Sequence, residues 1–180
     1  MNKSAILEIF YEYDYVTYYT VRLLGEDDEP EALSETDKFY EQFDDAGNAS
    51  FGEFDTILRI IDAIGYWERG AEDFLFRFED AAHALPSNRG HAKKALGIKV
   101  IENSRLRLYC IRLTNRIVIL LNGGVKTHGQ ALACPNVKEH FRFAQAAAKS
   151  IDIMLVEKSI VIDGKYLINN TMDDQITLNV

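Results

Sequence analysis

The sequence predicts an α+β fold in which a small antiparallel sheet packs against helices. Three observations lead to this fold class. Two segments carry apolar residues at helical spacing, strand-like apolar runs lie between them, and Asp163-Gly164 separates two further apolar runs near the end of the chain. With 180 residues, 47% of them hydrophobic, we expect one compact domain. It divides into an acidic N-terminal extension at 1–50, a core at 51–155 and a C-terminal hairpin extension at 156–180.

The sequence of the N-terminal half predicts a strand or hairpin followed by two helices. Alternating aromatic and polar residues predict β-structure near Tyr15–Leu24. Ser34 is placed to cap a short helix that includes the run KFYEQF. We expect Trp67 and the phenylalanines of Phe74–Phe78 in the core. Between residues 51 and 69, apolar side chains three and four positions apart predict an amphipathic helix: Phe54, Ile57, Leu58, Ile61 and Ile64.

The sequence of the C-terminal half predicts three strands, a helix and a hairpin. Pro86 and the polar run after it predict an exposed loop. Strands are expected at 97–102, 105–113 and 116–121, and the last is aliphatic on both parities over 117–121, which is typical of a strand buried on both faces. Asp163-Gly164 predicts a hairpin turn. Pro135 introduces a predicted helix with one apolar stripe: Val137, Phe141, Ala144, Ala148 and Ile151.

Charge is distributed unevenly along the chain, whose net charge is -8. Residues 1–82 carry 6 Lys/Arg and 21 Asp/Glu, whereas residues 83–150 carry 12 and 2. The basic segment is either a phosphate-binding surface or a solvated part of a mixed surface. If it binds phosphate, the acidic N-terminal part is placed to cover and inhibit it. Both interpretations stand at this point.

The sequence predicts a soluble, cytoplasmic protein. The first ten residues lack a secretory pattern, and the longest aliphatic run, 117–121, is far too short to cross a bilayer. Cys110 and Cys134 are the two cysteines, too few for a disulfide scaffold, so both are expected to be reduced.

The most informative stretch is SRLRLYCIRLTNRIVILLNGGVKT, residues 104–127. A hairpin with its tip at Thr114-Asn115 opposes residues whose numbers sum to 229, so that Arg107 faces Asn122. Glycines 123 and 124 are expected to allow a bend and a close approach by the backbone of a ligand. This register places five polar side chains on one face: Arg105, Arg107, Tyr109, Asn122 and Lys126.

Such a face suits cleavage of RNA by its own 2′-hydroxyl group. This reaction needs a proton acceptor, positive charge for the phosphorane and a proton for the leaving oxygen. We assign phosphorane stabilisation to Arg107, charge and proton exchange to Lys126, and base stacking to Tyr109. His128 is the nearest titratable residue and is either a third catalytic group or an incidental loop histidine. Arg105, Asn122 and Arg142 complete the predicted RNA-binding set.

Other chemistries have weaker sequence support. The chain contains no Walker P-loop, no Gly-x-Gly-x-x-Gly run and no nucleophile elbow. His128, Cys134 and His140 match no common zinc arrangement, so neither a metal site nor a cofactor is expected.

The run LRLYCIRL…RIVILLNGGVKT, with helices before it and a proline-started helix containing FRFAQAAAKSI after it, resembles the RelE/ParE toxin superfamily, in particular its phage-derived HigB-like branch. The resemblance covers residues 53–152. It implies a RelE-like core, with Arg107 at the strand arginine often needed for RNA cleavage and Lys126 at the first lysine of the usual pair. Thr127 stands at the second lysine, and Gly123-Gly124 replaces the usual Gly-Phe step.

Two functions follow from this resemblance. The first is a toxin of a toxin–antitoxin system that cleaves mRNA without metal at the ribosome and binds a small helix-turn-helix antitoxin. The second is a non-enzymatic binding protein that uses the same scaffold to engage a partner protein or DNA gyrase. RNA or the ribosome is the expected partner of the first, and neither function involves a membrane.

Overall fold

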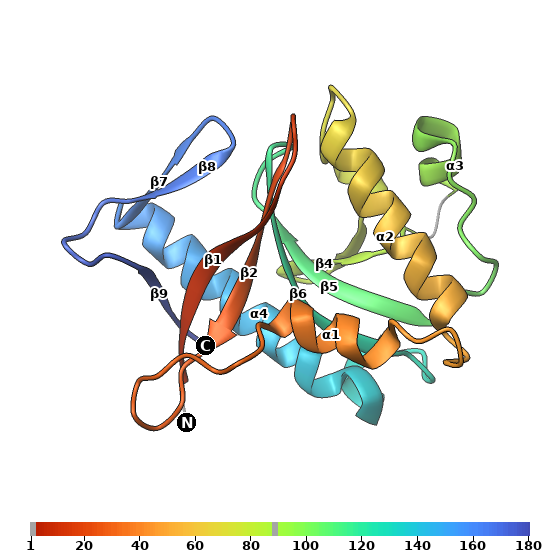
Figure 1. Cartoon of the computed structure of the whole chain (residues 1–180), viewed down its shortest axis with the longest axis horizontal. Helices are drawn as coiled ribbons and strands as arrows, with labels where there is room; N and C mark the ends of the chain where they lie inside the picture. Colours follow the sequence, from red (N-terminus) through yellow and green to blue (C-terminus); the bar gives the residue numbers. More distant parts are fainter. Residues whose placement is uncertain (1–2, 88–89) are drawn as a thin grey trace.

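The computed structural model describes residues 3–87 and 90–180. Its elements are drawn in Figure 1 and follow one another along the chain as β1 (Ser4–Glu12), β2 (Thr17–Leu23), α1 (Glu35–Phe43), α2 (Phe51–Tyr66), β3 (Arg77–Glu79), β4 (Ala82–Leu85), α3 (His91–Leu96), β5 (Leu106–Arg112), β6 (Ile117–Val125), α4 (Pro135–Val156), β7 (Ile160–Asp163), β8 (Tyr166–Asn169) and β9 (Ile176–Asn179). Short 3₁₀ turns lie at Asp73–Leu75 and Ala131–Ala133.

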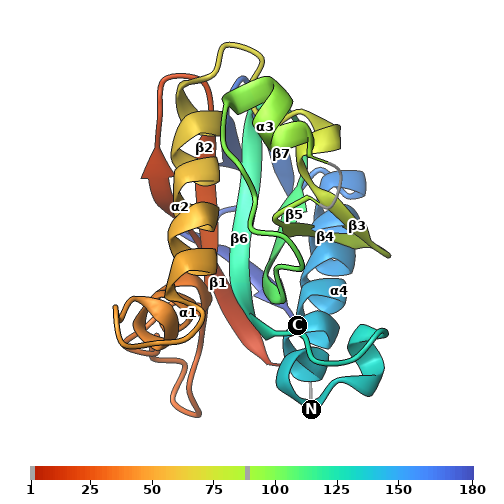
Figure 2. The same ribbon diagram turned by 90° about the vertical axis from the view of Figure 1, so that its right-hand side faces the viewer.

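Seven of the strands form one sheet in the order β3-β4-β5-β6-β2-β1-β9. Every pairing in it is antiparallel except that of β2 with β6. Helices α1 and α2 cover one face and α4 covers the other (Figure 2). Mixed helices and a mostly antiparallel sheet confirm the predicted α+β class.

Strand β6 lies at the centre of two hydrophobic cores. Ile117, Ile119 and Leu121 pack toward α4, whereas Val118 and Leu120 pack toward α2. All five are completely buried. A strand covered by helices on both faces needs apolar residues at both parities, so the aliphatic run correctly predicted this burial.

Helices α1, α2 and α4 begin where the sequence indicated, but α3 was not predicted. Ser34 and Asp37 form a capping box at the start of α1, because each side chain accepts a hydrogen bond from the other residue's backbone N–H. Pro135 occupies the first turn of α4, where its missing N–H costs nothing. The predicted α2 stripe packs against the sheet, with Leu58 only partly buried. The α4 stripe does the same, with Phe141 only partly buried.

Residues 4–23 form a hairpin within the main sheet. β2 pairs with β6 over only three residue pairs, Thr17–Tyr19 with Ile117–Ile119. Beyond them the first turn of α1 lies between the two strands. The Thr36 hydroxyl donates to the Leu120 carbonyl oxygen at 3.0 Å and lies 2.7 Å from the Thr20 hydroxyl. The acidic N-terminal part therefore supplies strands to the sheet. The hypothesis that this part covers and inhibits the basic segment did not include such a role.

The C-terminal hairpin is confirmed. β7 and β8 form a separate two-stranded sheet, and Asp163 pairs with Tyr166, so the turn consists of Gly164 and Lys165. Gly164 has φ of 59°, which a residue without a Cβ atom adopts at little cost. In the described ranges no helix is long and apolar enough to cross a membrane.

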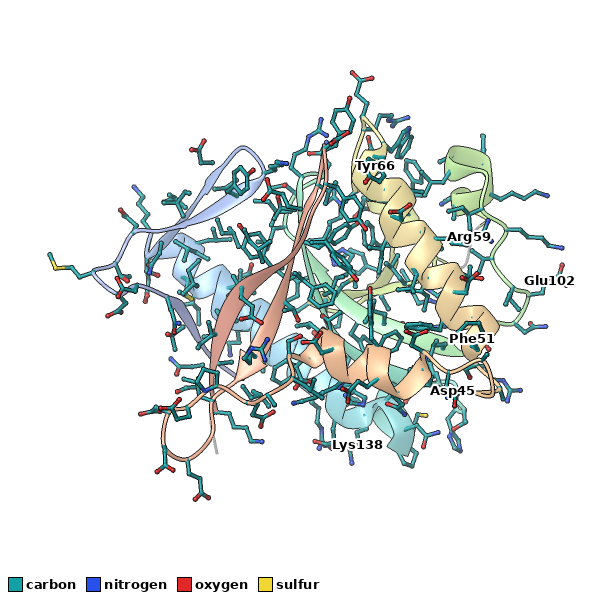
Figure 3. All side chains as sticks on the ribbon, viewed as in Figure 1. Asp45, Phe51, Arg59, Tyr66, Glu102 and Lys138 are labelled. Atoms are coloured by element: carbon teal, nitrogen blue, oxygen red, sulfur yellow. The ribbon has the colours of Figure 1, made fainter. Side chains whose placement is uncertain are left out.

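Two local predictions are wrong. The strand expected at 97–102 is irregular, because β5 already pairs with β4 on one side and β6 on the other, and only Ile98 in this segment is buried. Figure 3 shows Glu102 projecting outward from it. Phe78 was expected in the core but is 74% exposed, since it lies on edge strand β3. The β3–β4 hairpin itself was not predicted.

Candidate functional site

The predicted register of the β5–β6 hairpin is wrong by one or two residues. The loop at its tip leaves Arg112 paired with Val118, and a bulge between Leu108 and Cys110 shifts the pairing further, so that Arg107 faces Gly124. Bulges of this kind turn a side chain toward the other face of a sheet. Asn122 accordingly lies on the α1 face, where its amide donates to Glu35 at 3.2 Å, and it does not join the other predicted site residues.

Tyr109 cannot stack on a base. Its side chain is completely buried beneath α4, with its ring centroid 5.9 Å from that of Phe141. Burial raises the pKa of the Tyr109 phenol, so this group is also unsuited to proton transfer near neutral pH. The prediction failed because alternation along a strand gives the face on which a side chain lies and says nothing about what covers that face.

Arg107 is buried, with 6% of its surface exposed. One terminal nitrogen donates to the carbonyl oxygens of Ser104 and Leu106, at 2.9 and 2.7 Å. Arg105, two positions earlier, is exposed. The Lys126 backbone N–H donates to the Arg105 carbonyl oxygen, which places Lys126 across from Arg105 and on the same side of the ribbon as Arg107.

The other two predicted residues lie apart from Arg107. His128 is exposed in the loop after β6, and its Nδ1 atom lies 3.0 Å from the Thr127 hydroxyl. Arg142 is exposed on α4 and forms an ion pair with Glu139 at 3.0 Å. Neither makes a hydrogen bond or ion pair with Arg107 among residues 3–87 and 90–180.

The glycines of the ribbon are approached by the protein's own backbone. A Cβ atom on Gly123 would lie 1.8 Å from the Arg107 carbonyl oxygen, and one on Gly124 would lie 2.7 Å from the Asn136 carbonyl oxygen. Both glycines are buried. The close approach expected of a ligand backbone is thus made by β5 and by the start of α4.

Arg77 on β3 is a site residue that the sequence prediction missed. Its strand is separated from that of Arg107 by β4, and burial together with the Arg107 charge lowers the pKa of Arg77 to about 10. Burial lowers the pKa of Arg107 as well. Neither side chain forms an ion pair within the described chain.

The acidic groups that act on this pair are Glu79 and Glu53. One oxygen of Glu53 already accepts three hydrogen bonds, from the Ser104 hydroxyl and from the backbone N–H groups of Arg105 and Leu106. Three buried polar atoms around the pair lack a hydrogen-bond partner in the part of the chain that is described: the Nε atoms of Arg77 and Arg107 and the hydroxyl of Tyr109. The pair is therefore an under-compensated, partly buried centre of positive charge.

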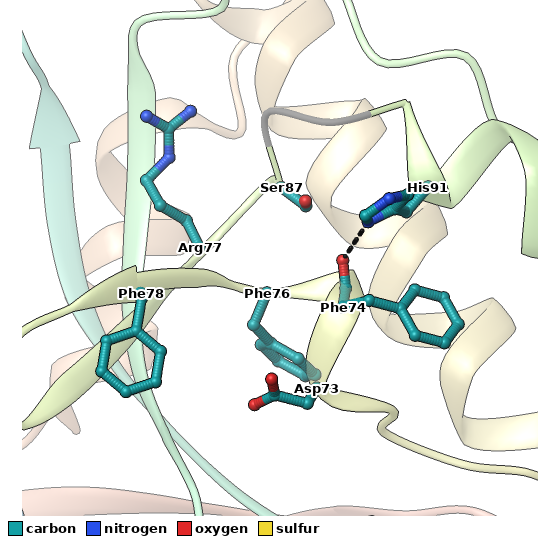
Figure 4. A pocket seen from close by; sticks show the side chains of 7 residues that line it. All are labelled: Asp73, Phe74, Phe76, Arg77, Phe78, Ser87 and His91. Carbon is teal, nitrogen blue, oxygen red and sulfur yellow. Dashed lines mark hydrogen bonds between the residues drawn. The ribbon is translucent and has the colours of Figure 1, made fainter.

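Two open cavities meet at Arg77. One, of about 440 Å³, is lined by Arg77, Pro86, Ser87, Val100, Ile101, Glu102, Asn103 and Ser104. Arg107 lies directly behind it, bonded to the Ser104 carbonyl oxygen. The other, of about 390 Å³, is lined by Asp73, Phe74, Phe76, Arg77, Phe78, Ser87 and His91 (Figure 4). In Figure 4 Arg77 and Phe78 extend to opposite sides of β3.

A guanidinium at the wall of such a cavity can bind a phosphate oxygen through charge-assisted hydrogen bonds, and a second one behind it strengthens the field. A signal for Arg77 exists in the sequence: FRFE, residues 76–79, alternates apolar and charged residues, as an edge strand does. What periodicity cannot show is that this strand pairs with β4, which in turn pairs with β5, the strand that carries Arg107.

Cys134 forms a separate polar cluster at the start of α4. Its sulfur accepts a hydrogen bond from the Thr127 N–H at 3.3 Å. Burial raises the pKa of the Cys134 thiol, but hydrogen bonds from Thr127 and His128 outweigh this effect and lower the pKa to about 6. For Cys110, burial alone raises the pKa of the thiol. The two cysteines are therefore expected to titrate in different ranges.

The ultraviolet absorbance of the thiolate should show Cys134 ionising with a midpoint about 6. The step should be absent in Cys134→Ser and move upward in Thr127→Val, which removes one donor. Because the folded-state pKa lies below the unfolded value, this group stabilises the fold above the unfolded pKa and loses that contribution as the pH falls through about 6. A midpoint in the ordinary cysteine range would contradict the hydrogen-bond geometry.

Among residues 3–87 and 90–180, no group of three or more His, Cys, Asp or Glu side chains is arranged to hold a metal ion. No protein-family model, curated protein sequence or solved structure matches this chain.

Proposed function

We propose that this protein is a cytoplasmic toxin of a toxin–antitoxin system that binds RNA at the Arg77–Arg107 pair and cleaves it without a metal ion. The observation that carries the proposal is the pair itself: Arg77 lines a cavity, Arg107 lies behind it, and neither guanidinium forms an ion pair with a carboxylate among residues 3–87 and 90–180. A phosphodiester is the anion that an RNA-directed protein meets most often, and its charge increases in the transition state of cleavage.

In this proposal Arg77 contacts the phosphate, and Arg107 stabilises the phosphorane from behind Ser104. Lys126 lies on the same side of the ribbon as Arg107 and exchanges protons with the reacting oxygens. The proposal also draws on the resemblance to RelE-like toxins; in this chain the elements from α2 to the proline-started α4 follow one another as α2, β3, β4, α3, β5, β6 and α4. A small helix-turn-helix antitoxin and the ribosome are the partners this proposal requires.

A second candidate is a non-enzymatic binding protein on the same scaffold, directed at a partner protein or DNA gyrase. The burial of Arg107 and Tyr109 favours it, because a group that contacts reacting atoms must be reachable. Thr127 in place of a second lysine also favours it.

Expression of the wild type and of Arg77→Ala and Arg107→Lys in a bacterial host tests the proposal through growth and mRNA integrity. Arg59→Ala is the matched control, because Arg59 is an exposed arginine on α2 that lines neither cavity (Figure 3). We expect growth arrest with cut mRNA in the wild type and in Arg59→Ala. Purified Arg77→Ala should bind RNA about tenfold to a hundredfold more weakly, the cost of one charge-assisted contact.

The outcomes separate the two candidates. Growth arrest with mRNA cuts that disappear in Arg77→Ala supports the nuclease. Arrest without cuts supports the binding protein. If Arg77→Ala and Arg59→Ala bind RNA with equal affinity, Arg77 and Arg107 do not bind RNA, and neither candidate function can rest on them.

A further inference from the structure

A third cavity lies next to the two at Arg77, at the end of α2. It has a volume of about 560 Å³ and is lined by Trp67, Arg69, Phe74, His91, Lys94 and Ala95. Phe74 and His91 also line the cavity of Figure 4, so the three cavities follow one another from Trp67 past Arg77 to Ser104. The proposed function does not use this third cavity.

Its wall contains an exposed cation, Arg69, against two aromatic rings, Trp67 and Phe74, which meet edge to face. The Arg69 guanidinium carbon lies 5.2 Å from the centroid of the Trp67 ring and 5.9 Å from that of Phe74. The Arg69 Nε atom donates to Glu72 at 3.0 Å, which fixes the orientation of the guanidinium. The Arg69 side chain is nevertheless 61% exposed, so it remains available to a ligand. Planar rings and guanidiniums of this kind are the surfaces on which unpaired bases stack.

The far side of the cavity is held in place by His91. Its Nδ1 atom lies 2.9 Å from the Phe74 carbonyl oxygen, the interaction dashed in Figure 4, and its ring meets that of Phe74 edge to face at 5.4 Å. Lys94, one helical turn after His91 on α3, adds a mobile positive charge at the rim. The cavity thus combines stacking surfaces with a cation that can reach a phosphate.

The acidic groups nearby limit what charge alone can do. Glu72 pairs with Arg69, Asp73 lines the middle cavity and Glu102 lines the cavity at Ser104. These carboxylates offset part of the attraction of Arg69, Arg77 and Lys94 for a phosphate backbone. Specific binding here must therefore depend on stacking between a base and the aromatic side chains, because the stacking energy does not depend on the sign of nearby charges.

We propose that the Trp67–Arg69–Phe74 cavity binds an unpaired base of the RNA strand whose phosphate contacts Arg77. This inference rests on the proposed function and specifies its substrate as single-stranded. A base within a duplex is already stacked on its neighbours and cannot enter the cavity without leaving them.

The chain contains one tryptophan, so Trp67 fluorescence reports on this cavity directly. Three probes are titrated into the full chain: a short unstructured RNA, a ribose-phosphate oligomer of equal length without bases, and an RNA duplex. The unstructured RNA should quench Trp67 and bind about tenfold more tightly than the abasic oligomer. Arg69→Ala should remove most of that advantage. Lys93→Ala, which deletes a positive charge from α3 outside the cavity, should keep it.

The possible results separate the base site from the proposed function. If all three probes bind equally and Arg77→Ala weakens them all, the phosphate site stands and the base site is wrong. If single-stranded RNA binds with quenching but no mRNA is cut in cells, the base site stands and the nuclease does not. If no probe binds at micromolar protein, both are wrong.

Discussion

Gly123→Ala is expected to unfold the protein or to destabilise it by about 5 kcal/mol or more. A Cβ atom at this position would lie 1.8 Å from the Arg107 carbonyl oxygen, 2.8 Å from its carbonyl carbon and 3.0 Å from the Leu108 Cα atom. All three are backbone atoms of β5, so no side-chain rotation relieves the overlap. The two central strands would have to separate, and both hydrophobic cores depend on their pairing.

Gly129→Ala is the matched control. Gly129 lies in the loop after β6, its φ is outside the left-handed region, and a Cβ atom there meets nothing within 4 Å. Urea denaturation followed by circular dichroism should show Gly129→Ala unfolding near the wild-type midpoint and Gly123→Ala without a folded baseline. A Gly123→Ala protein of normal stability would mean that β5 and β6 are not paired in this register.

The second large effect is expected from Glu53→Ala, with a loss of about 2–4 kcal/mol in the free energy of unfolding. One carboxylate oxygen of Glu53 accepts hydrogen bonds from Ser104 Oγ at 2.6 Å and from the Arg105 and Leu106 N–H groups at 2.7 Å each. Leu106 is completely buried, so its N–H would lose its partner with little access to water. Glu53 thereby attaches the N-terminal turn of α2 to the first residue of β5.

Glu53→Gln keeps a carbonyl oxygen that can accept the same bonds without charge, so it should lose about 1 kcal/mol. Asp55→Ala, an exposed carboxylate two residues along α2, controls for the loss of negative charge. Denaturant titrations of the three variants measure the difference. Equal stability of Glu53→Ala and Asp55→Ala would show that the start of β5 does not depend on α2.

Helices α1, α2 and α4 could be predicted because their signals are local, whereas α3 was not predicted. The capping box of α1, the apolar stripes of α2 and α4 and the proline at the start of α4 each lie within a few turns of sequence. The turn at Gly164 is local as well. The strand expected at 97–102 failed because a strand needs a partner with a free edge, and β5 had none.

The candidate site was only partly predictable for the same reason. Arg107 was identified from its place on a hydrophobic ribbon, and Arg105 and Lys126 do share its side. Asn122 is not part of the site because a bulge turns it to the other face of the sheet, and Tyr109 is not part of it because α4 covers its side chain. Arg77 is 30 residues from Arg107 in sequence, and only the pairing of β3 and β5 with the two edges of β4 brings their strands into one sheet region.

By itself, the sequence determined the α+β class, the starts of α1, α2 and α4, and the segregation of positive charge into residues 83–150. These follow from propensity, capping and periodicity, which act between residues close along the chain. The tertiary structure alone decided the register of β5 and β6, which side chains α4 covers, and the meeting of Arg77 with Arg107. Those depend on strand pairing and burial between distant segments, and one extra residue in a bulge is enough to move a side chain from one face of the sheet to the other.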